Sequence, residues 1–539
     1  MTVPALRKLR VAGPSAFRRG MRGGWHLARR GISRALPVVV FGLAGLILAN
    51  GVLTLSPAKV ISTVLTLVGL GVFFRRVELG VLVLIMVSAT IMYESMIPKP
   101  FTVGHMGFSV AEILVLYLCS LVLLHTGSEK RMNYFDSPLT TPFVLLGFAI
   151  LLSLAVGYYG YLSDPRTSTW SFTGSYNAAR PLFLYLLFFV VGFGVKDAKK
   201  LRFLVNAVIV LATIVAVLLV VQYFLGTHVK VFFGTPYSGP RVESLEEGSS
   251  VTRSIPPGTS LMYIFLPVVS IMACIGKKRE RLLYGAASLI CAVGLMFTFT
   301  RNLWAAVFVS FVLLLWTAGR QIRRKLIVVG VPMLLCAVLL GVAIGNLAPG
   351  AAGEFGKAFI SRLESVFESG ILKNASLQHR MSENRSVLRV IRENPIFGIG
   401  LGNPVRYQAV TGPNNRQAIV PTSIIHNSYL ELYAVHGLFG VISYAWLIIA
   451  VLIRGVQGYR CLRDPFHRAL ALGLTVACPA YLISAFVAMI LLHDIPTIIA
   501  IAFAWGVVEA AIRVEREQAG EREASPQQIG SVSALGEMK

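Results

Sequence analysis

Apolar stretches of about 20 residues alternate with short polar linkers along most of the chain. A helix of that length crosses a hydrocarbon core of about 30 Å and satisfies its own backbone polar groups inside lipid. The pattern therefore predicts an all-α polytopic membrane protein with about 12 to 14 transmembrane helices. The predicted spans are 37–55, 58–74, 77–93, 109–125, 139–159, 181–195, 203–225, 258–275, 282–300, 302–318, 326–347, 427–453, 469–491 and 496–512.

These spans divide the chain into five parts. A basic tail (1–36), in which we find no signal-peptide cleavage site, precedes a transmembrane bundle (37–347). A large loop with helical sequence in it (348–425) separates this bundle from the C-terminal transmembrane helices (426–512). The last part (513–539) is a polar tail that we expect to be disordered.

The charge pattern predicts the orientation of the spans. A net charge of +25 first suggests a nucleic-acid partner. The basic residues instead gather in the tails and in alternate linkers, such as 196–202, 320–325 and 454–468. Cytoplasmic loops of membrane proteins are enriched in Lys and Arg in this way. We therefore expect no nucleic-acid partner, an inner-membrane location, and cytoplasmic N- and C-termini.

Three segments are then predicted to lie outside, namely 160–179, 226–257 and 348–425. The last is basic, against the rule, because long loops are translocated largely regardless of their charge.

Arg301 lies between two apolar stretches, in the sequence Thr298-Phe299-Thr300-Arg301-Asn302. An ionisable residue at membrane depth is costly and is a candidate functional residue. The competing interpretation is an interfacial arginine whose side chain reaches the headgroups.

The sequence 378–394 predicts a helix of about four turns that ends at Pro395. It is followed by the glycine-containing segment 398–402, which we expect to be a flexible loop. One predicted face is apolar and another is basic (Met381, Leu388 and Ile391; Arg385, Arg389 and Arg392). An amphipathic helix on anionic headgroups would also show this pattern.

His426 ends the polar loop and precedes an apolar span, so we expect it at the outer interface. Asn427 or Ser428 would cap the helix that follows.

Together these features resemble the O-antigen ligase and polymerase superfamily. The resemblance rests on Arg301 after a Thr-rich helix end, Arg380 ahead of Asn-Pro-Ile-Phe-Gly-Ile-Gly-Leu-Gly-Asn, and His-Asn-Ser-Tyr-Leu-Glu-Leu followed by His-Gly-Leu-Phe-Gly. It covers roughly residues 285–450 in detail. It implies that Arg301, Arg380 and His426 are the catalytic set. Arg385 stays an alternative to Arg380, because Asn384 stands where the family often has Trp.

The resemblance implies a glycosyltransferase that moves a glycan from a polyprenyl pyrophosphate, such as undecaprenyl pyrophosphate, to an acceptor hydroxyl at the outer face of the membrane. Pyrophosphate is a stable leaving anion, and arginine binds phosphate oxygens with two parallel hydrogen bonds. The aspartates form no Asp-x-Asp pair, so we expect a reaction without metal or cofactor. His426 would be the base, since imidazole is the usual one near pH 7, and direct displacement would invert the anomeric configuration.

Further substrate contacts are predicted at four positions, namely Arg385, Arg389, Arg180 and Asn427. Three acceptors remain open: a lipid A core sugar in lipopolysaccharide synthesis, a growing polysaccharide in a polymerase, or a protein hydroxyl. The competing class is a flippase for lipid-linked glycans. Transporters commonly show internal repeats and charges near the midplane, and we find neither.

Overall fold

The computed structural model describes residues 69–93, 96–97, 99, 101–103, 106–128, 137–163, 170–226, 229–232, 242–244, 252–330, 353–360, 375–411, 416–422 and 424–533. The predicted tail 1–36, the span 37–55 and most of the spans 58–74 and 326–347 lie outside these residues. The chain forms two compact units, residues 1–77 with 120–134, and residues 78–119 with 135–539.

In the first unit, the described residues are a helix over 69–75 and the last part of α4 (Val110–Ser128). The rings of Phe74 and His125 pack with centroids 5.3 Å apart. This contact joins the two segments.

The remaining described chain is mainly helical, as the hydropathy pattern predicts. Its helices are α3 (Val77–Ser88), α5 (Thr140–Ser163), α6 (Phe172–Phe183), η2 (Leu184–Leu186), α7 (Leu187–Gly194), α8 (Ala198–Leu225), α9 (Thr259–Ile275), α10 (Lys278–Met296), α11 (Arg301–Thr317), α12 (Arg320–Lys325), η3 (Leu326–Gly330), a helix over 353–360, α15 (Ala375–Glu393), α16 (Ser428–Cys461), α17 (Pro465–Ser484) and α18 (Ile495–Ser533).

Three short antiparallel hairpins lie in the connections between helices. They are β1–β2 (Phe101–Val103, Met106–Phe108), β3–β4 (Val242–Ser244, Thr252–Ser254) and β5–β6 (Val405–Thr411, Arg416–Thr422). In the longest one, Val405 pairs with Thr422 and Thr411 pairs with Arg416.

Six helical segments among the described residues are long and apolar enough to cross a membrane. They are α5, the continuous stretch Phe172–Gly194, α8, α16, α17 and the first part of α18 (Ile495–Ala519). Shorter apolar helices, including α9 and α11, accompany them. The chain is therefore a multi-pass membrane protein, and a total of about fourteen spans stays a prediction.

The prediction that the tail after Arg513 is disordered is wrong for the described residues, because α18 continues to Ser533. This stretch is rich in Ala, Glu, Arg and Gln, which are strong helix formers. Arg513 and Glu517 also face each other one turn apart, with 3.9 Å between Nη1 and Oε1.

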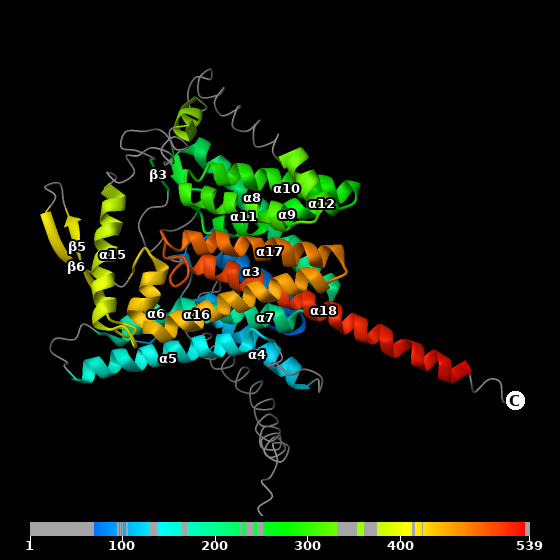
Figure 1. Ribbon diagram of the computed structural model, residues 1–539, viewed down its shortest axis with the longest axis horizontal. Coiled ribbons are helices and arrows are strands. Elements are labelled where there is room, and N and C mark those ends of the chain that lie inside the picture. The colour runs from blue at the N-terminus through cyan, green and yellow to red at the C-terminus, as the bar shows by residue number, and fades with distance from the viewer. Residues whose placement is uncertain are drawn as a thin grey trace, which may run out of the picture. The chain divides into compact units, whose positions relative to one another are not determined.

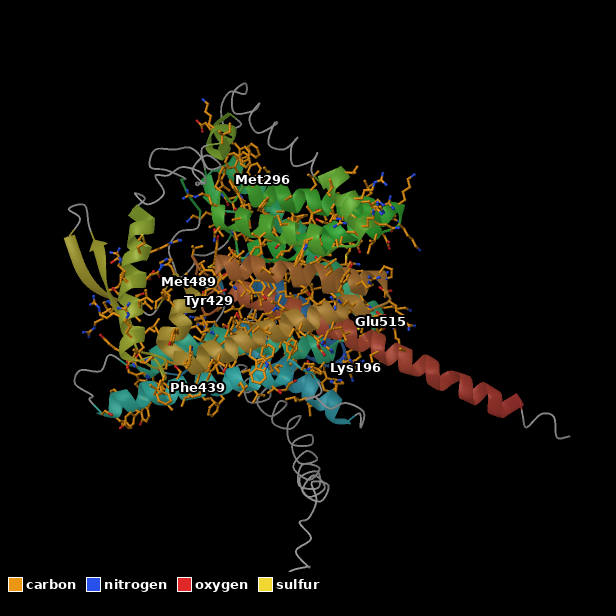
Figure 2. The ribbon with its side chains drawn as sticks, in the orientation of Figure 1. Lys196, Met296, Tyr429, Phe439, Met489 and Glu515 are labelled. Carbon is orange, nitrogen blue, oxygen red and sulfur yellow. The ribbon has the colours of Figure 1, made fainter. Side chains whose placement is uncertain are left out.

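The core of the second unit lies between α9, α17 and α18. α9 packs against α10, α17 and α8, and nearly all its side chains are buried. α16 lies against α5 and α17. Figure 1 shows these helices side by side, with α15 and the β5–β6 hairpin at one end of them. That end contains Tyr429 and Met489, while Lys196 and Glu515 lie toward the opposite end (Figure 2).

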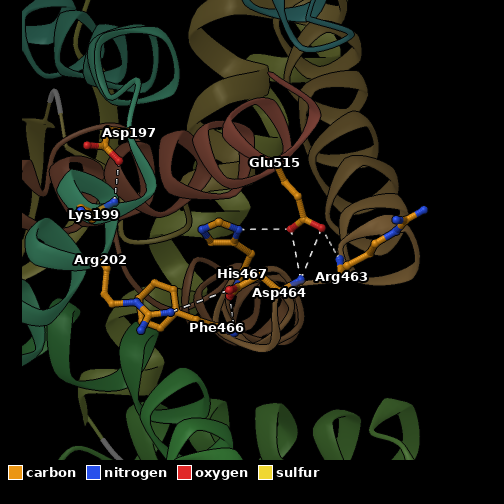
Figure 3. Close-up of polar contacts among 8 residues, drawn as sticks. All are labelled: Asp197, Lys199, Arg202, Arg463, Asp464, Phe466, His467 and Glu515. Atoms are coloured by element: carbon orange, nitrogen blue, oxygen red, sulfur yellow. Dashed lines mark hydrogen bonds and ion pairs between the residues drawn. The ribbon is translucent and has the colours of Figure 1, made fainter. Parts of the chain in front are cut away.

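The opposite end brings two of the basic linkers together, as the charge pattern predicts for one membrane face. Arg202, near the start of α8, lies with its guanidinium 4.6 Å from the centre of the Phe466 ring and 3.9 Å from Asp464 (Figure 3). The Glu515 carboxylate accepts hydrogen bonds from the backbone N–H groups at Arg463 and Asp464. Helix α18 is thereby tied to the start of α17.

The charge pattern suggests that Arg454 lies in a linker. The residue instead lies inside α16. It is 9% exposed, and its guanidinium forms a two-point ion pair with Glu509 of α18, at 2.8 and 2.9 Å. The buried guanidinium is stable there because the Glu509 carboxylate accepts both of these hydrogen bonds.

Candidate functional site

Two of the glycine-containing motifs seen in the sequence pack against each other. Helix α16 is interrupted at Gly437, where φ is 63° and ψ is −163°. The interruption leaves carbonyls without their helical partners, and the backbone N–H groups of Ile399 and Gly400 donate to those of Ala434 and Val435, at 2.8 and 3.2 Å. A break in a membrane helix is stable when other backbone groups are satisfied in this way.

The segment 398–402 is consequently not the flexible loop expected from its glycines. The Leu401 N–H donates to the Ser153 carbonyl of α5, at 3.0 Å. The Leu401 carbonyl accepts from Trp170 Nε1 at 2.9 Å. The segment is therefore fixed between α5, α16 and the start of α6.

The glycines in this segment are required by geometry. Gly398, Gly400 and Gly402 have φ values of 70°, 82° and 97°, which residues other than glycine rarely adopt. A Cβ on Gly400 would also lie 2.2 Å from the Gly157 nitrogen. The repeated glycine allows close backbone docking of the two motifs.

His426 directly precedes α16, as predicted. Asn427 is the N-cap, and its Oδ1 accepts the N–H groups of Tyr429 and Leu430 at 3.1 and 3.2 Å. Ser428 Oγ donates to the Ala488 carbonyl at 2.8 Å. The backbone beside His426 is thus held in place, while a substrate contact from Asn427 stays a prediction.

The nearest partner of His426 is a residue that the sequence analysis did not single out. Glu383 of α15 places Oε2 3.1 Å from His426 Nδ1 and 3.3 Å from its backbone nitrogen. Glu383 is 1% exposed, whereas the His426 side chain is 39% exposed. Burial, followed by the Glu383 charge, raises the pKa of the nearby Tyr407 phenol.

The buried face of α15 differs from the predicted one. Met381 and Leu388 are 40% and 43% exposed. Ile391 is buried as its apolar face predicts, but its buried neighbour is Val387, and both pack against β5 and α16 in a cluster with Val405, Ile425 and Ala434. The buried stripe therefore recurs every four residues, at 383, 387 and 391, and it includes the glutamate.

The arginines of α15 fall on two sides of the helix. Arg380 is half-buried and lies three residues before Glu383, which places both on the same side. Arg385, Arg389 and Arg392 are exposed and turn away from that side. Of the two alternatives left open by the sequence, Arg380 is the one that shares the Glu383 side of α15.

Arg301 begins α11, directly after the turn from α10. Phe299 in this turn has φ of 48°, which is unusual for a residue other than glycine. Its ring is buried with Tyr223 and Phe359, and Trp304 packs against the same cluster. α11 packs on α17, which packs on α16, so one helix separates the helix of Arg301 from the helix that follows His426.

Arg180 is buried in α6, where its Nε lies 2.6 Å from Glu112 Oε1 of α4. Glu112 also accepts the Ser109 N–H at 2.8 Å. The ion pair gives Arg180 a structural partner, and its predicted contact with pyrophosphate remains untested.

A second glutamate–histidine pair joins the first turn of α16 to the connection between α17 and α18. Glu431 Oε1 is 2.5 Å from His493 Nε2, and both side chains are largely buried. Burial lowers the pKa of His493, but the Glu431 charge and hydrogen bond raise it by more, so the net shift is upward. His436 is also buried, at 5% exposed.

Glu383 could have been found in the sequence by one signal, a charged residue in line with Val387 and Ile391 at helical spacing. Such a residue must have a partner, because an unpaired buried carboxylate is strongly unfavourable. Its partner, more than forty residues away in the chain, is not visible in any local pattern. Among the described residues, no three His, Cys, Asp or Glu side chains gather as a metal site would require.

Residues 286–445 match the family model Wzy_C, described as O-Antigen ligase. The matched range includes Arg301, α15, the segment 398–402 and His426. No curated protein matches the chain. The resemblance seen in the sequence is thereby confirmed for this region, which is similar to the O-antigen ligase family.

Proposed function

We propose that the protein transfers a glycan from a polyprenyl pyrophosphate carrier to an acceptor hydroxyl, at the outer face of the bacterial inner membrane. The observation that supports this most is the placement of His426, a partly open histidine held by a buried carboxylate on the helix that contains Arg380. The family match over the same residues supports the reaction class. The acceptor of a ligase-type enzyme is a sugar of the lipid A core.

The reaction needs positive charge at the leaving group. As the acceptor oxygen bonds to the anomeric carbon, the bond from that carbon to the pyrophosphate oxygen breaks. Arg301 and Arg380 bind the departing pyrophosphate, since a guanidinium meets two phosphate oxygens at once. Arg385 and Arg389, on the other side of α15, add an exposed basic surface.

The acceptor must lose its proton in the same step. His426 takes this proton, and the glycan is transferred with inversion. The products are the glycosylated acceptor and polyprenyl pyrophosphate. No step calls for a metal or cofactor.

The orientation follows the charge pattern. The end with Lys196 and Arg463 faces the cytoplasm together with both termini, and the end with α15 and β5–β6 faces outward. Cysteine in place of Gly412 should react with a membrane-impermeant maleimide in intact spheroplasts. Reaction only after lysis would reverse this orientation.

The function is tested in cells that depend on this protein. With His426→Ala, lipid-linked donor should accumulate at the outer face while the glycosylated acceptor is lost. A flippase gives another result, namely donor that accumulates at the inner face. That outcome would overturn the proposal.

A further inference from the structure

We propose that Glu383 is a positioning residue for the transfer reaction. In this inference, its carboxylate fixes the orientation of the His426 ring so that Nε2 receives the proton of the acceptor hydroxyl. The inference rests on the proposed function, because it requires His426 to be the base.

The location of Glu383 is the first argument. It is 1% exposed and shares its side of α15 with Val387 and Ile391, which are 0% and 7% exposed. A carboxylate among apolar side chains destabilises a fold unless its oxygens are hydrogen-bonded. A purely structural position in this stripe would be filled better by an aliphatic residue.

The contacts of Glu383 are the second argument. Oε2 lies 3.1 Å from His426 Nδ1 and 3.3 Å from the His426 backbone nitrogen, and Oε1 lies 3.4 Å from Nδ1. The carboxylate therefore holds both the backbone and the ring of the same residue. Two points of attachment restrict the ring to one orientation at the start of α16.

This geometry determines which ring nitrogen is the base. A carboxylate accepts a hydrogen bond, so Nδ1 carries a hydrogen and donates it to Glu383. In the neutral ring, Nε2 then has the lone pair. Since Glu383 is buried and the His426 side chain is 39% exposed, the open part of the ring is the part directed away from the carboxylate.

The charge of Glu383 acts in the same step. When Nε2 takes the proton from the acceptor oxygen, the ring becomes a cation with both nitrogens protonated. Glu383 stabilises this cation through Nδ1–H and does not itself take the proton. The proton leaves His426 for water after the product departs.

A simple structural role makes a different prediction. Glu383 would then only tie α15 to the start of α16, where apolar contacts among Val387, Val405 and Ile425 already join the same elements. Replacing Glu383 would then lower stability, and it would lower activity equally in the wild-type and the His426→Ala backgrounds.

The test is a double-mutant cycle with full-length protein in proteoliposomes. The probes are the lipid-linked glycan extracted from the host membrane and the host acceptor. Glu383→Gln should lower kcat about a hundredfold, with the KM for the donor within about twofold. In the His426→Ala background, the same change should alter the residual rate by less than about twofold, because Glu383 acts through His426.

The matched control is Glu393→Gln, an exposed glutamate at the end of the same helix, which should leave kcat unchanged. Near wild-type kcat in a well-folded Glu383→Gln protein would overturn the inference. An equal loss in both backgrounds would also overturn it and would favour the structural role.

If the Glu383→Gln protein does not insert into the membrane, the inference is tested with Glu383→Asp. The shorter carboxylate withdraws from Nδ1, so kcat should fall about tenfold while the charge is kept. An unchanged kcat would overturn the inference. Failure of the proposed function is distinguishable, because His426→Ala would then turn over like the wild type whatever residue stands at 383.

Discussion

Two glutamate–histidine pairs flank the start of α16, and they differ in how much of the histidine is open. In Glu383–His426 the carboxylate is buried and the ring is 39% exposed. In Glu431–His493 the side chains are 3% and 15% exposed, and the two atoms lie only 2.5 Å apart. The same two residue types thus form an accessible site in one case and an internal tie between helices in the other. Exposure of the histidine, rather than its pairing, separates a candidate base from a structural residue.

Removing the open histidine should have the largest effect. His426→Ala should lower kcat by about a hundredfold to ten-thousandfold, because the acceptor proton loses its positioned base. The matched change His493→Ala, in the buried pair, should lower the unfolding temperature and leave kcat of the remaining folded protein within a few-fold. Similar kcat losses in both variants would remove the distinction between the pairs.

Variants of the arginines test the proposed binding of the donor. Arg301→Lys and Arg380→Lys should each lower kcat about a hundredfold, since an ammonium lacks the planar fork for phosphate. Arg392→Lys on the exposed side of α15 is the control and should be near wild type. If Arg301→Lys and Arg380→Lys both keep activity within a few-fold, these residues are interfacial anchors.

The segment 398–402, which follows α15 and packs against the break in α16, should be sensitive to side-chain size. Gly400→Ala should destabilise the fold by about 2 kcal/mol, because φ there is 82° and the new Cβ would contact the Gly157 backbone. Thermal unfolding in detergent measures this loss. Gly160→Ala on α5 is the control, since a Cβ there meets nothing within 4 Å. Equal melting temperatures for the two variants would contradict the tight docking of the segment.

The smallest expected effect concerns the pH dependence of stability in the buried pair. The pKa of His493 is raised in the folded protein by Glu431, after the opposing effect of burial. Its contribution to stability is therefore complete below the unfolded pKa of about 6.5 and is lost as the pH rises through the raised value. Unfolding temperature measured from pH 6 upward should fall more steeply for the wild type than for Glu431→Gln. Parallel curves would show that the pair does not titrate in this range.

Much of the helical architecture could be predicted from the sequence, because membrane helices are marked by length and hydropathy alone. The turn before Arg301 and the Asn427 cap both follow from local signals that the structure confirms. The end of α18 was missed, since a polar sequence with strong helix formers resembles a disordered tail.

The site was predictable only in part. Motifs single out His426 and Arg380 as candidates, whereas no motif marks Glu383, because its position matters only through contact with a residue far along the chain. The segment 398–402 was misjudged for a similar reason. Glycine permits flexibility and also permits close docking, and only the neighbouring backbone distinguishes the two.

The proposed transfer is tested most directly by product analysis with purified protein in liposomes, using lipid-linked donor and acceptor in the presence of a metal chelator. One polyprenyl pyrophosphate should be released for each acceptor glycosylated by the wild type, and His426→Ala should form neither product at a comparable rate. Glycosylation that stops when metal is removed would contradict the metal-independent step. Equal turnover by wild type and His426→Ala would contradict the central claim that this histidine activates the acceptor.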